Sequence, residues 1–188
     1  MVNITAILEA PAAAINPQAV DNTIVIDVMR DNTGRGDVGN VNFRIRVPYT
    51  SMVDIETKIG NLSVTNIRSG LVRAHISSEG DITLTNIISP FVAAENVTGD
   101  IFFDGEIVTN GTYRFQSMMG HINIRIPFPS NFKFVAMASS PRSISLGSFS
   151  GAGVRIIGDG RKILGQAGDG SASLQVTNQR GIIAFVTR

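Results

Sequence analysis

The sequence is poor in the residues that most often carry chemistry. Its 188 residues include no cysteine, which excludes disulfide bonds and thiolate ligands or nucleophiles. Charged residues make up 16% of the chain, whereas about 25% is typical of soluble domains. The formal net charge is only +1. The basic footprint that nucleic-acid binding usually needs is therefore missing, and we expect no nucleic-acid partner.

Long apolar segments are missing as well. Apolar residues make up 43% of the chain, yet no run approaches the roughly 18 residues of a membrane-spanning helix. The first residues also lack the basic region that begins a secretory signal peptide. We expect neither a membrane span nor a leader within this chain.

What the sequence does contain is a repeat centred on glycine. The segments ETKIGNLSV, SSEGDITL, NVTGDIFF and SMMGHINI are centred on Gly60, Gly80, Gly99 and Gly120, at spacings of 20, 19 and 21 residues. A period near 20 that is built from strand-type residues is typical of a stacked β-repeat array.

Apolar residues alternate around each glycine. They stand two and four positions after it, at Leu62/Val64, Ile82/Leu84, Ile101/Phe103 and Ile122/Ile124. They also precede it in pairs, at Val53/Ile55, Val72/Ala74, Val92/Ala94 and Tyr113/Phe115, with the Val72/Ala74 pair shifted by one residue. Residues two apart on a strand face the same side, so each unit reads as two strands flanking a turn. Only stacked units can bury such faces, and we predict an all-β solenoid with coils of about 20 residues.

The glycines suit turns in which φ is positive, and the Asn or Asp residues that follow tolerate turn geometry. The predicted structural turn residues are Gly60, Gly80, Asp81, Gly99, Asp100, Gly120 and Gly181.

Weaker copies extend the array. In PRSISL, Arg142 takes the glycine position, with Val135 and Met137 as the preceding apolar pair, and NQRGIIAF is centred on Gly181. Strands are also predicted at 22–28 and at 41–47, the latter half-buried. We expect a single domain, 1–188, with residues 1–21 as an N-terminal cap and a glycine-rich excursion at 147–171.

These residues resemble the bacterial adhesin-like β-strand-repeat family, a domain family of unknown function. The resemblance rests on the turns at Ser77–Leu84 and Val97–Phe103, on Ile126-Pro127, and on the segment 168–185. It covers roughly residues 41–187. It implies a right-handed, single-stranded β-solenoid in an exported, periplasmic or cell-surface protein, without agreed catalytic residues. The chain departs from the pattern at His121, Arg142 and Ile182.

The acidic turn residues and the histidines are the first candidate site residues. Asp81 and Asp100 occupy equivalent positions, in a row with Asn61 and His121. Paired carboxylates can serve acid–base chemistry or bind Ca²⁺, but turn carboxylates more often accept backbone N–H groups, which is the reading we favour. His75 lies in a different phase of the repeat from His121, and a transition-metal site needs three or four convergent ligands. We expect no catalytic residue, no metal and no cofactor.

The glycine-rich segment 147–170 lacks the spacing of a P-loop and the tandem repeats of a calcium-binding β-roll. It reads as turns around a short strand at 154–157, with Arg161 and Lys162 at a solvated bend. As a loop-rich insertion on a rigid scaffold, it is a natural place for binding.

Four phenylalanines, Phe91, Phe102, Phe128 and Phe149, fall outside the clearest core positions. They could stack on sugar rings, or cap the array and fill its corners. With Arg161 and Lys162 they form the candidate binding surface.

Three functional classes fit these features. The first is a non-catalytic envelope or surface module that binds a polysaccharide or protein partner, or acts as a spacer. The others are a self-assembling scaffold and a polysaccharide-active enzyme, which would need clustered carboxylates. We expect the first, with the oligomeric state left open.

Overall fold

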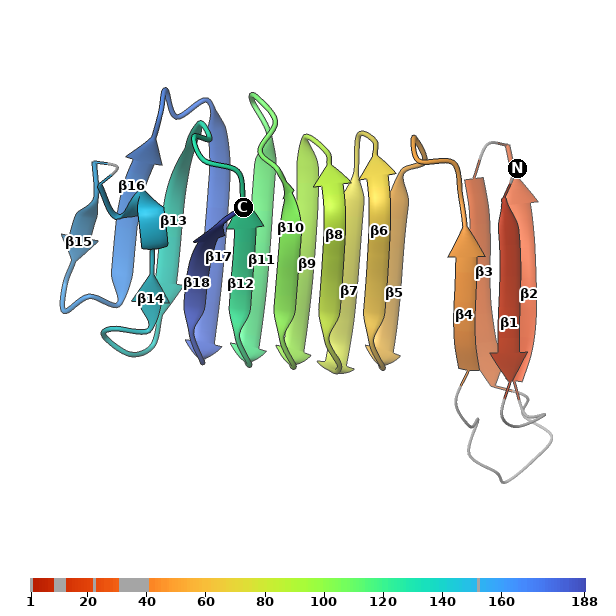
Figure 1. The fold of residues 1–188 in the computed structure, drawn as a ribbon. Coiled ribbons are helices and arrows are strands. Elements are labelled where there is room, and N and C mark those ends of the chain that lie inside the picture. Colours follow the sequence, from red (N-terminus) through yellow and green to blue (C-terminus); the bar gives the residue numbers. More distant parts are fainter. Residues whose placement is uncertain (1, 9–12, 22, 31–40, 152) are drawn as a thin grey trace. The chain divides into compact units, whose positions relative to one another are not determined.

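The computed structural model describes residues 2–8, 13–21, 23–30, 41–151 and 153–188. They form two compact units, Met1–Pro48 and Tyr49–Arg188, where the sequence predicts one domain. The described residues are all-β, with no α-helix and one short 3₁₀ helix (Figure 1).

The first unit consists of two strand pairs. Strand β1 (Asn3–Leu8) pairs antiparallel with β4 (Val41–Arg46), and β2 (Ala13–Val20) pairs antiparallel with β3 (Thr23–Arg30). Strands β3 and β4 correspond to the predicted strands, and β1 and β2 lie within the segment predicted as a cap. Contrary to the predicted half-burial of β4, Phe43 and Ile45 are exposed, because a two-stranded pair buries little on either face.

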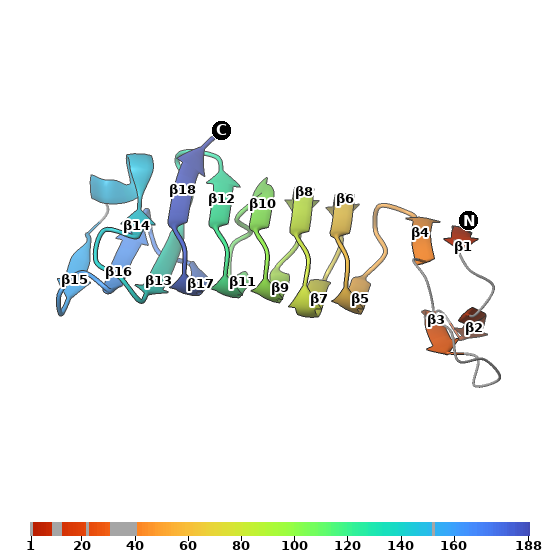
Figure 2. The ribbon, with the colours of Figure 1, turned by 90° about the horizontal axis from the view of Figure 1, so that it is seen from below.

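In the second unit, each repeat supplies one strand to each of two sheets. The strands that precede the glycine turns are β5 (Val53–Ile59), β7 (Val72–Glu79), β9 (Phe91–Thr98), β11 (Thr112–Met119) and β17 (Ala172–Arg180). Those that follow the turns are β6 (Leu62–Arg68), β8 (Ile82–Ile88), β10 (Ile101–Glu106), β12 (Ile122–Ile126) and β18 (Ile183–Thr187). We call each such pair of strands a coil. Figure 2 shows the two sheets of this unit as two layers joined by the turns.

Neighbouring coils pair in parallel. The sheet orders are β15-β16-β13-β17-β11-β9-β7-β5 for the eight-stranded sheet and β14-β18-β12-β10-β8-β6 for the six-stranded sheet. The one-residue shift of the apolar pair before Gly80 corresponds to a bulge in β7. Between Ile76 and Glu79, β7 has one more residue than the paired segments of β5 and β9. The extra residue is absorbed within β7, so its apolar side chains stay on the inner face.

The core lies between the two sheets and follows the predicted alternation. The inward side chains are mostly aliphatic, with aromatic clusters in the middle of the stack and at its β13 end. In the middle, Phe103 packs against Tyr113 and Phe115 with ring centroids 6.1 and 5.0 Å apart. All three side chains are buried. Because each coil is covered by its neighbours, the core continues along the stack.

A column of glycines brings the coils together at one edge. Gly60, Gly80, Gly99, Gly120 and Gly181 all have φ between 114° and 148°. A Cβ atom at Gly80 would lie 2.1 Å from the Gly60 carbonyl oxygen, and at Gly99, Gly120 and Gly181 the corresponding distances are 2.2, 2.0 and 1.7 Å. Only at Gly60, where the column begins, is the space open. Both the backbone conformation and the spacing of the coils therefore require glycine.

The coils do not stack in sequence order. The chain leaves β12, forms β13 (Phe132–Ala138) and β14 (Ile144–Ser145), and returns through β17 and β18, which lie between β11/β12 and β13/β14. Arg188, after β18, reaches across β12 to Asp104 of β10, with both Nε and Nη2 2.8 Å from Oδ1. The Asp104 side chain is only 12% exposed. This ion pair connects the coil of β17 and β18 to the coil of β9 and β10, two positions along the stack.

The position of Arg142 explains this order. It is in register with Gly181, since Ile144 pairs with Ile183 two residues after each, but its φ is 69°. That value lies near the left-handed helical region, which non-glycine residues can adopt, unlike the wider angles of the column. The coil with Gly181 can continue the column, and the coil with Arg142 can only end it.

Strand β13 also corrects a predicted core pair. Val135 and Met137 lie on the outer face and are half-buried, whereas Phe134 and Ala136 face the core opposite Leu174 and Val176. The wider turn before Arg142 shifts the strand by one residue, and a shift of one residue exchanges the two faces of a strand.

The end of the stack is closed by the glycine-rich excursion. The 3₁₀ helix η1 (Gly147–Gly151) places Phe149 in the core, where it is 1% exposed and packs against Phe128, Phe132 and Phe185. Phe149 is therefore not part of a binding surface. It fills the end of the core next to β18, which carries Phe185.

After η1 the excursion forms a hairpin. Strand β15 (Arg155–Ile157) pairs antiparallel with β16 (Lys162–Ala167), and β16 pairs antiparallel with β13. The short strand expected at 154–157 is β15. Gly165 faces the core, where a Cβ atom would lie 2.2 Å from the Phe134 ring, so the ring can lie directly on the strand.

Tyr113 forms hydrogen bonds with the loops at the edge opposite the glycine turns, between β8 and β9 and between β10 and β11. Its buried hydroxyl accepts a hydrogen bond from the Val108 N–H at 2.7 Å and lies within donating distance of the carbonyl oxygens of Ser89, at 2.9 Å, and Glu106, at 3.2 Å. One hydroxyl thus satisfies backbone groups of two loops that would otherwise be buried unpaired. Burial raises the pKa of Tyr113, and the Val108 N–H opposes this in part.

The glycine column predicts a graded response to alanine. Gly60→Ala should lower the free energy of unfolding by about 1–2 kcal/mol, from backbone strain alone. Gly99→Ala should lower it by roughly 3 kcal/mol or more, because the Cβ also overlaps the neighbouring coil. Urea denaturation followed by circular dichroism measures both. Equal losses at the two positions would contradict the argument from coil spacing.

Replacing Tyr113 by Phe should lower the free energy of unfolding by about 1–3 kcal/mol, because the Val108 N–H loses its acceptor. A raised pKa means that the folded state holds the phenolic proton where the unfolded state, with a pKa near 10, releases it. Stability should therefore fall as the pH rises above about 10, and this fall should be smaller in Tyr113→Phe. Urea denaturation of both proteins at about pH 9 and pH 11 tests this, and parallel losses would contradict it.

Candidate functional site

The residues after the glycines form a row of hydrogen bonds along the turn edge. The Asp81 N–H donates to Asn61 Oδ1 at 2.9 Å, the Asp100 N–H to Asp81 Oδ1 at 2.8 Å, and the His121 N–H to Asp100 Oδ1 at 2.7 Å. The Ile182 N–H donates to His121 Nδ1 at 3.1 Å. Each side chain accepts the backbone N–H of the next coil, so the row connects coils rather than satisfying its own turn.

This use limits the chemistry of the two aspartates. Asp81 and Asp100 lie in adjacent coils, as predicted for a row, and each directs one oxygen to a neighbouring backbone N–H. Among the described residues, no group of three or more His, Asp or Glu side chains lies close enough together to hold a metal ion. The two carboxylates have an evident structural role in the stack.

His121 shows how the row tolerates a different side chain. It accepts through Nδ1, so in the neutral ring the proton lies on Nε2, as the donor–acceptor pattern requires. Imidazole, carboxamide and carboxylate side chains thus serve the same purpose at successive rungs. The departure from the Gly-Asp pattern at this position leaves the row intact.

A second column of polar side chains lies inside the core, three residues before the glycines. Asn96 Nδ2 donates to the Gly80 carbonyl at 3.0 Å, and Asn178 Nδ2 to the Gly120 carbonyl at 2.8 Å. Ser117 makes the equivalent, longer contact at 3.4 Å. These carbonyls lie where the coils approach most closely, so the buried donors compensate for lost hydration. Sequence reasoning missed this column, although its constant offset from the glycines could have revealed it.

Two further asparagines form a similar pair on the six-stranded sheet. Asn66 and Asn86 have φ of 57° and 54°, and Asn86 Nδ2 donates to Asn66 Oδ1 at 2.8 Å. Asparagine tolerates this left-handed conformation better than most residues. The Thr-Asn-Ile sequence repeated 20 residues apart is the signal that sequence analysis did not use.

The outer face of the eight-stranded sheet carries ion pairs on β5, β7, β9 and β11. Arg73 Nε lies 2.7 Å from Asp54 Oδ1, and its Nη2 lies 3.6 Å from Glu56. The hydrogen bond to Asp54 and the negative charge of its carboxylate raise the pKa of Arg73. Arg114 Nε lies 3.0 Å from Glu95. Such exposed pairs add little to stability, but they place acids beside both arginines, Arg73 and Arg114.

The same face changes character on the last four strands. Its outward residues are Ser173, Gln175, Thr177 and Gln179 on β17, Lys133, Val135 and Met137 on β13, Lys162, Leu164 and Gln166 on β16, and Arg155 and Ile157 on β15. None of these outward positions on the four strands is Asp or Glu. We call this surface the acid-free face.

The predicted binding residues are not brought together. Phe91 lies on the outer face of the eight-stranded sheet and Phe102 on the outer face of the six-stranded sheet. Phe128 lies on a loop, 61% exposed and edge-on to buried Phe149. They form no shared surface, because they belong to different faces of the stack.

The two predicted basic residues also differ from each other. Arg161 lies on the hairpin bend, where its Nε is 2.9 Å from Asp159. Lys162 begins β16 and belongs to the acid-free face. Sequence analysis did not find the rest of that face, because its strands become neighbours only through the out-of-order stacking.

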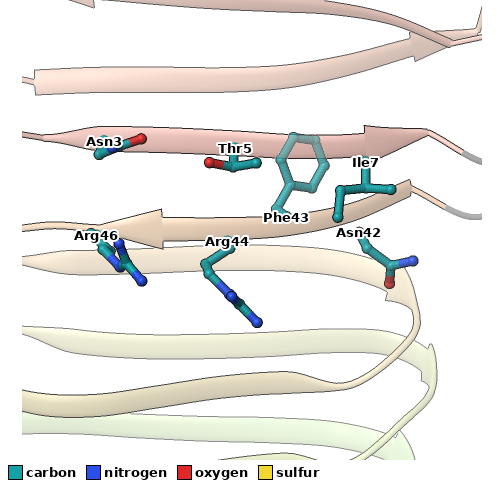
Figure 3. Close-up of a pocket in the computed structure, with 7 residues that line it drawn as sticks. All are labelled: Asn3, Thr5, Ile7, Asn42, Phe43, Arg44 and Arg46. Atoms are coloured by element: carbon teal, nitrogen blue, oxygen red, sulfur yellow. The ribbon is translucent and has the colours of Figure 1, made fainter.

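The first unit has a hollow of about 320 Å³ over β1 and β4. Asn3, Thr5 and Ile7 of β1 and Asn42, Phe43, Arg44 and Arg46 of β4 surround it (Figure 3). Arg44 and Arg46 are two residues apart and share one side of their strand. Two guanidinium groups can bind a carboxylate or phosphate, but the hollow is shallow and lies on a two-stranded pair.

Comparisons with protein-family models, with curated proteins and with solved structures found no match for this chain. Within the part of the chain that the structure describes, no helix has both the length and the apolar character needed to cross a membrane.

The turn row predicts that His121 can be exchanged for another acceptor. His121→Ala should lower the free energy of unfolding by about 0.5–1.5 kcal/mol and increase amide hydrogen exchange at Ile182. His121→Asn, which copies the side chain at Asn61, should retain most of both. Urea denaturation and exchange at Ile182 are the measurements. If the two variants behave alike, the hydrogen bond does not contribute as described.

Proposed function

We propose that this protein is a non-catalytic binding or spacer module of the bacterial cell envelope or cell surface. Its second unit is, in this proposal, a right-handed, single-stranded β-solenoid. The hand, the exported location and the adhesin-like character come from the resemblance of the repeat to the adhesin-like β-strand-repeat family. Parallel pairing of successive coils is compatible with such a solenoid.

One observation carries the proposal: the polar groups at the turns connect the coils, while the sheet faces display their side chains. Asn61, Asp81, Asp100 and His121 all accept hydrogen bonds from neighbouring coils. The eight-stranded sheet offers a continuous outer face with charged and polar side chains. A rigid, extended face of this kind suits an extended partner better than a small molecule, which binds preferentially in a concave pocket.

A binding screen against bacterial cell-wall fractions and a glycan panel tests the proposal, with product analysis on every hit and sedimentation of the free protein. Saturable binding without turnover is the expected result, because the turn carboxylates serve the stack. Turnover that disappears in Asp81→Asn would instead indicate a polysaccharide-active enzyme. Sedimentation as a polymer at micromolar concentration would indicate a self-assembling scaffold.

A control separates binding from adsorption to exposed turns. Asp81→Asn retains an acceptor oxygen for the Asp100 N–H, so it should preserve both fold and binding. Loss of binding in this variant, with an unchanged melting temperature, would place the partner at the turn edge and contradict the proposal that the sheet face binds.

A further inference from the structure

We infer that the acid-free face binds an acidic polysaccharide; this inference rests on the proposed function and identifies its ligand class. The face combines cations without acidic partners, amides and hydroxyls, and a central apolar strip. Each of these features corresponds to one part of a chain of sugar acids.

The charges are arranged to attract an anion. Lys133, Lys162 and Arg155 lie on three successive strands, β13, β16 and β15. On these strands and β17 no outward residue is acidic, whereas on the other half of the sheet Arg73 and Arg114 lie 2.7 and 3.0 Å from carboxylate oxygens. The cations of the acid-free face are therefore available to an external carboxylate, with charge-assisted hydrogen bonds. Lys58 on β5 is exposed as well, but its strand also carries the outward acids Asp54 and Glu56.

Their spacing suits an extended ligand. Lys133 pairs with Gln166, and Met137, four residues along β13, pairs with Lys162. At about 3.3 Å per residue, the two lysines are separated by roughly 13 Å along the strand direction. Arg155 pairs with Leu164, midway between them. Such a separation favours a polymer with repeated charges over a single anionic group.

The remaining side chains favour a sugar chain over other polyanions. Val135 and Leu164 pair with each other between the two lysines and, together with Met137 beside Lys162, form an apolar strip. Gln175 lies beside Val135 and Gln166 beside Lys133. Aliphatic side chains can cover the C–H faces of sugar rings, while amides both donate to and accept from ring hydroxyls. No outward residue on these four strands is aromatic, which removes the stacking that single-stranded nucleic acids use.

The test uses polygalacturonate, a chain of sugar acids, as the probe. Its methyl-esterified form serves as the uncharged match, and polyglutamate and double-stranded DNA as other polyanions. Isothermal titration calorimetry should show binding to polygalacturonate that weakens with added salt, because screening reduces the attraction between exposed charges. Binding to the esterified chain should be at least tenfold weaker, and polyglutamate and DNA should not compete at equal charge.

Charge reversal locates the binding surface. Lys133→Glu and Lys162→Glu should each weaken binding of polygalacturonate about fivefold to tenfold, which corresponds to the loss of about one exposed charge-assisted contact. Lys58→Glu is the matched control, since Lys58 is an exposed lysine on β5, at the other end of the same sheet. Lys133→Gln and Lys162→Gln, with unchanged circular dichroism, guard against misfolding of the charge-reversal variants.

Several outcomes would overturn the inference. Equal losses in Lys58→Glu and Lys133→Glu would mean that net charge alone matters. Equal affinity for polyglutamate or DNA would remove the preference for sugars. Binding of neutral glycans or cell-wall fractions, with no effect of the lysine variants, would leave the proposed function standing while this inference fails. No binding to any polymer in either screen would also contradict a binding role for the chain.

Discussion

The second unit depends on the close approach of successive glycines at one edge. At Gly80, Gly99, Gly120 and Gly181, a Cβ atom would lie about 2 Å from the preceding glycine carbonyl, so the coils can reach their hydrogen-bonding distance only where the side chain is absent. The same positions require a positive φ that turns the chain from one sheet to the other. A single residue type therefore sets both the turn and the spacing. The stacking order follows from it, because the coil with Gly181 can extend the column, whereas the coil with Arg142 cannot.

Close approach also determines where polar groups are available for function. Bringing two backbones together at the column buries carbonyls and N–H groups that need partners. Asn96, Ser117 and Asn178 supply donors from inside, and the residues after the glycines supply acceptors outside. The turn carboxylates, which sequence analysis interprets as acceptors of backbone N–H groups, thus contribute to the stacking of the coils. Polar side chains that do not connect coils lie on the outer faces of the sheets, because every second side chain of a strand points outward.

The local pattern was enough to predict the strands of the glycine repeat, but not the order in which the coils stack. The spacing of the glycines and the apolar residues at fixed offsets predicted the strands and the row from Asn61 to His121, because these depend on neighbours one coil away. Placing β17 between β11 and β13 depends on pairings such as Thr112 with Ser173 and Phe132 with Ala172, which are 61 and 40 residues apart, and no local signal records them. Phe149 was misplaced on the surface for the same reason. It lies outside the repeat, and it is buried only because η1 folds back over Phe132 and Phe185.

The out-of-order coil also shapes the surface on which function depends. Had β13 followed β11 directly, Lys133 and Val135 would lie beside Arg114 and the ion pairs of β9. Strand β17 instead separates them with Ser173, Gln175 and Thr177, and the antiparallel hairpin β15–β16 extends the sheet beyond β13 with Lys162 and Arg155. The outward residues of β17, which are polar and uncharged, thus separate Lys133 from the ion pairs of β9, three strands away. Charges that have no partner within the fold remain able to bind a charged ligand from outside, and in a chain with so few charges their grouping on one surface is the feature that most directly indicates a partner.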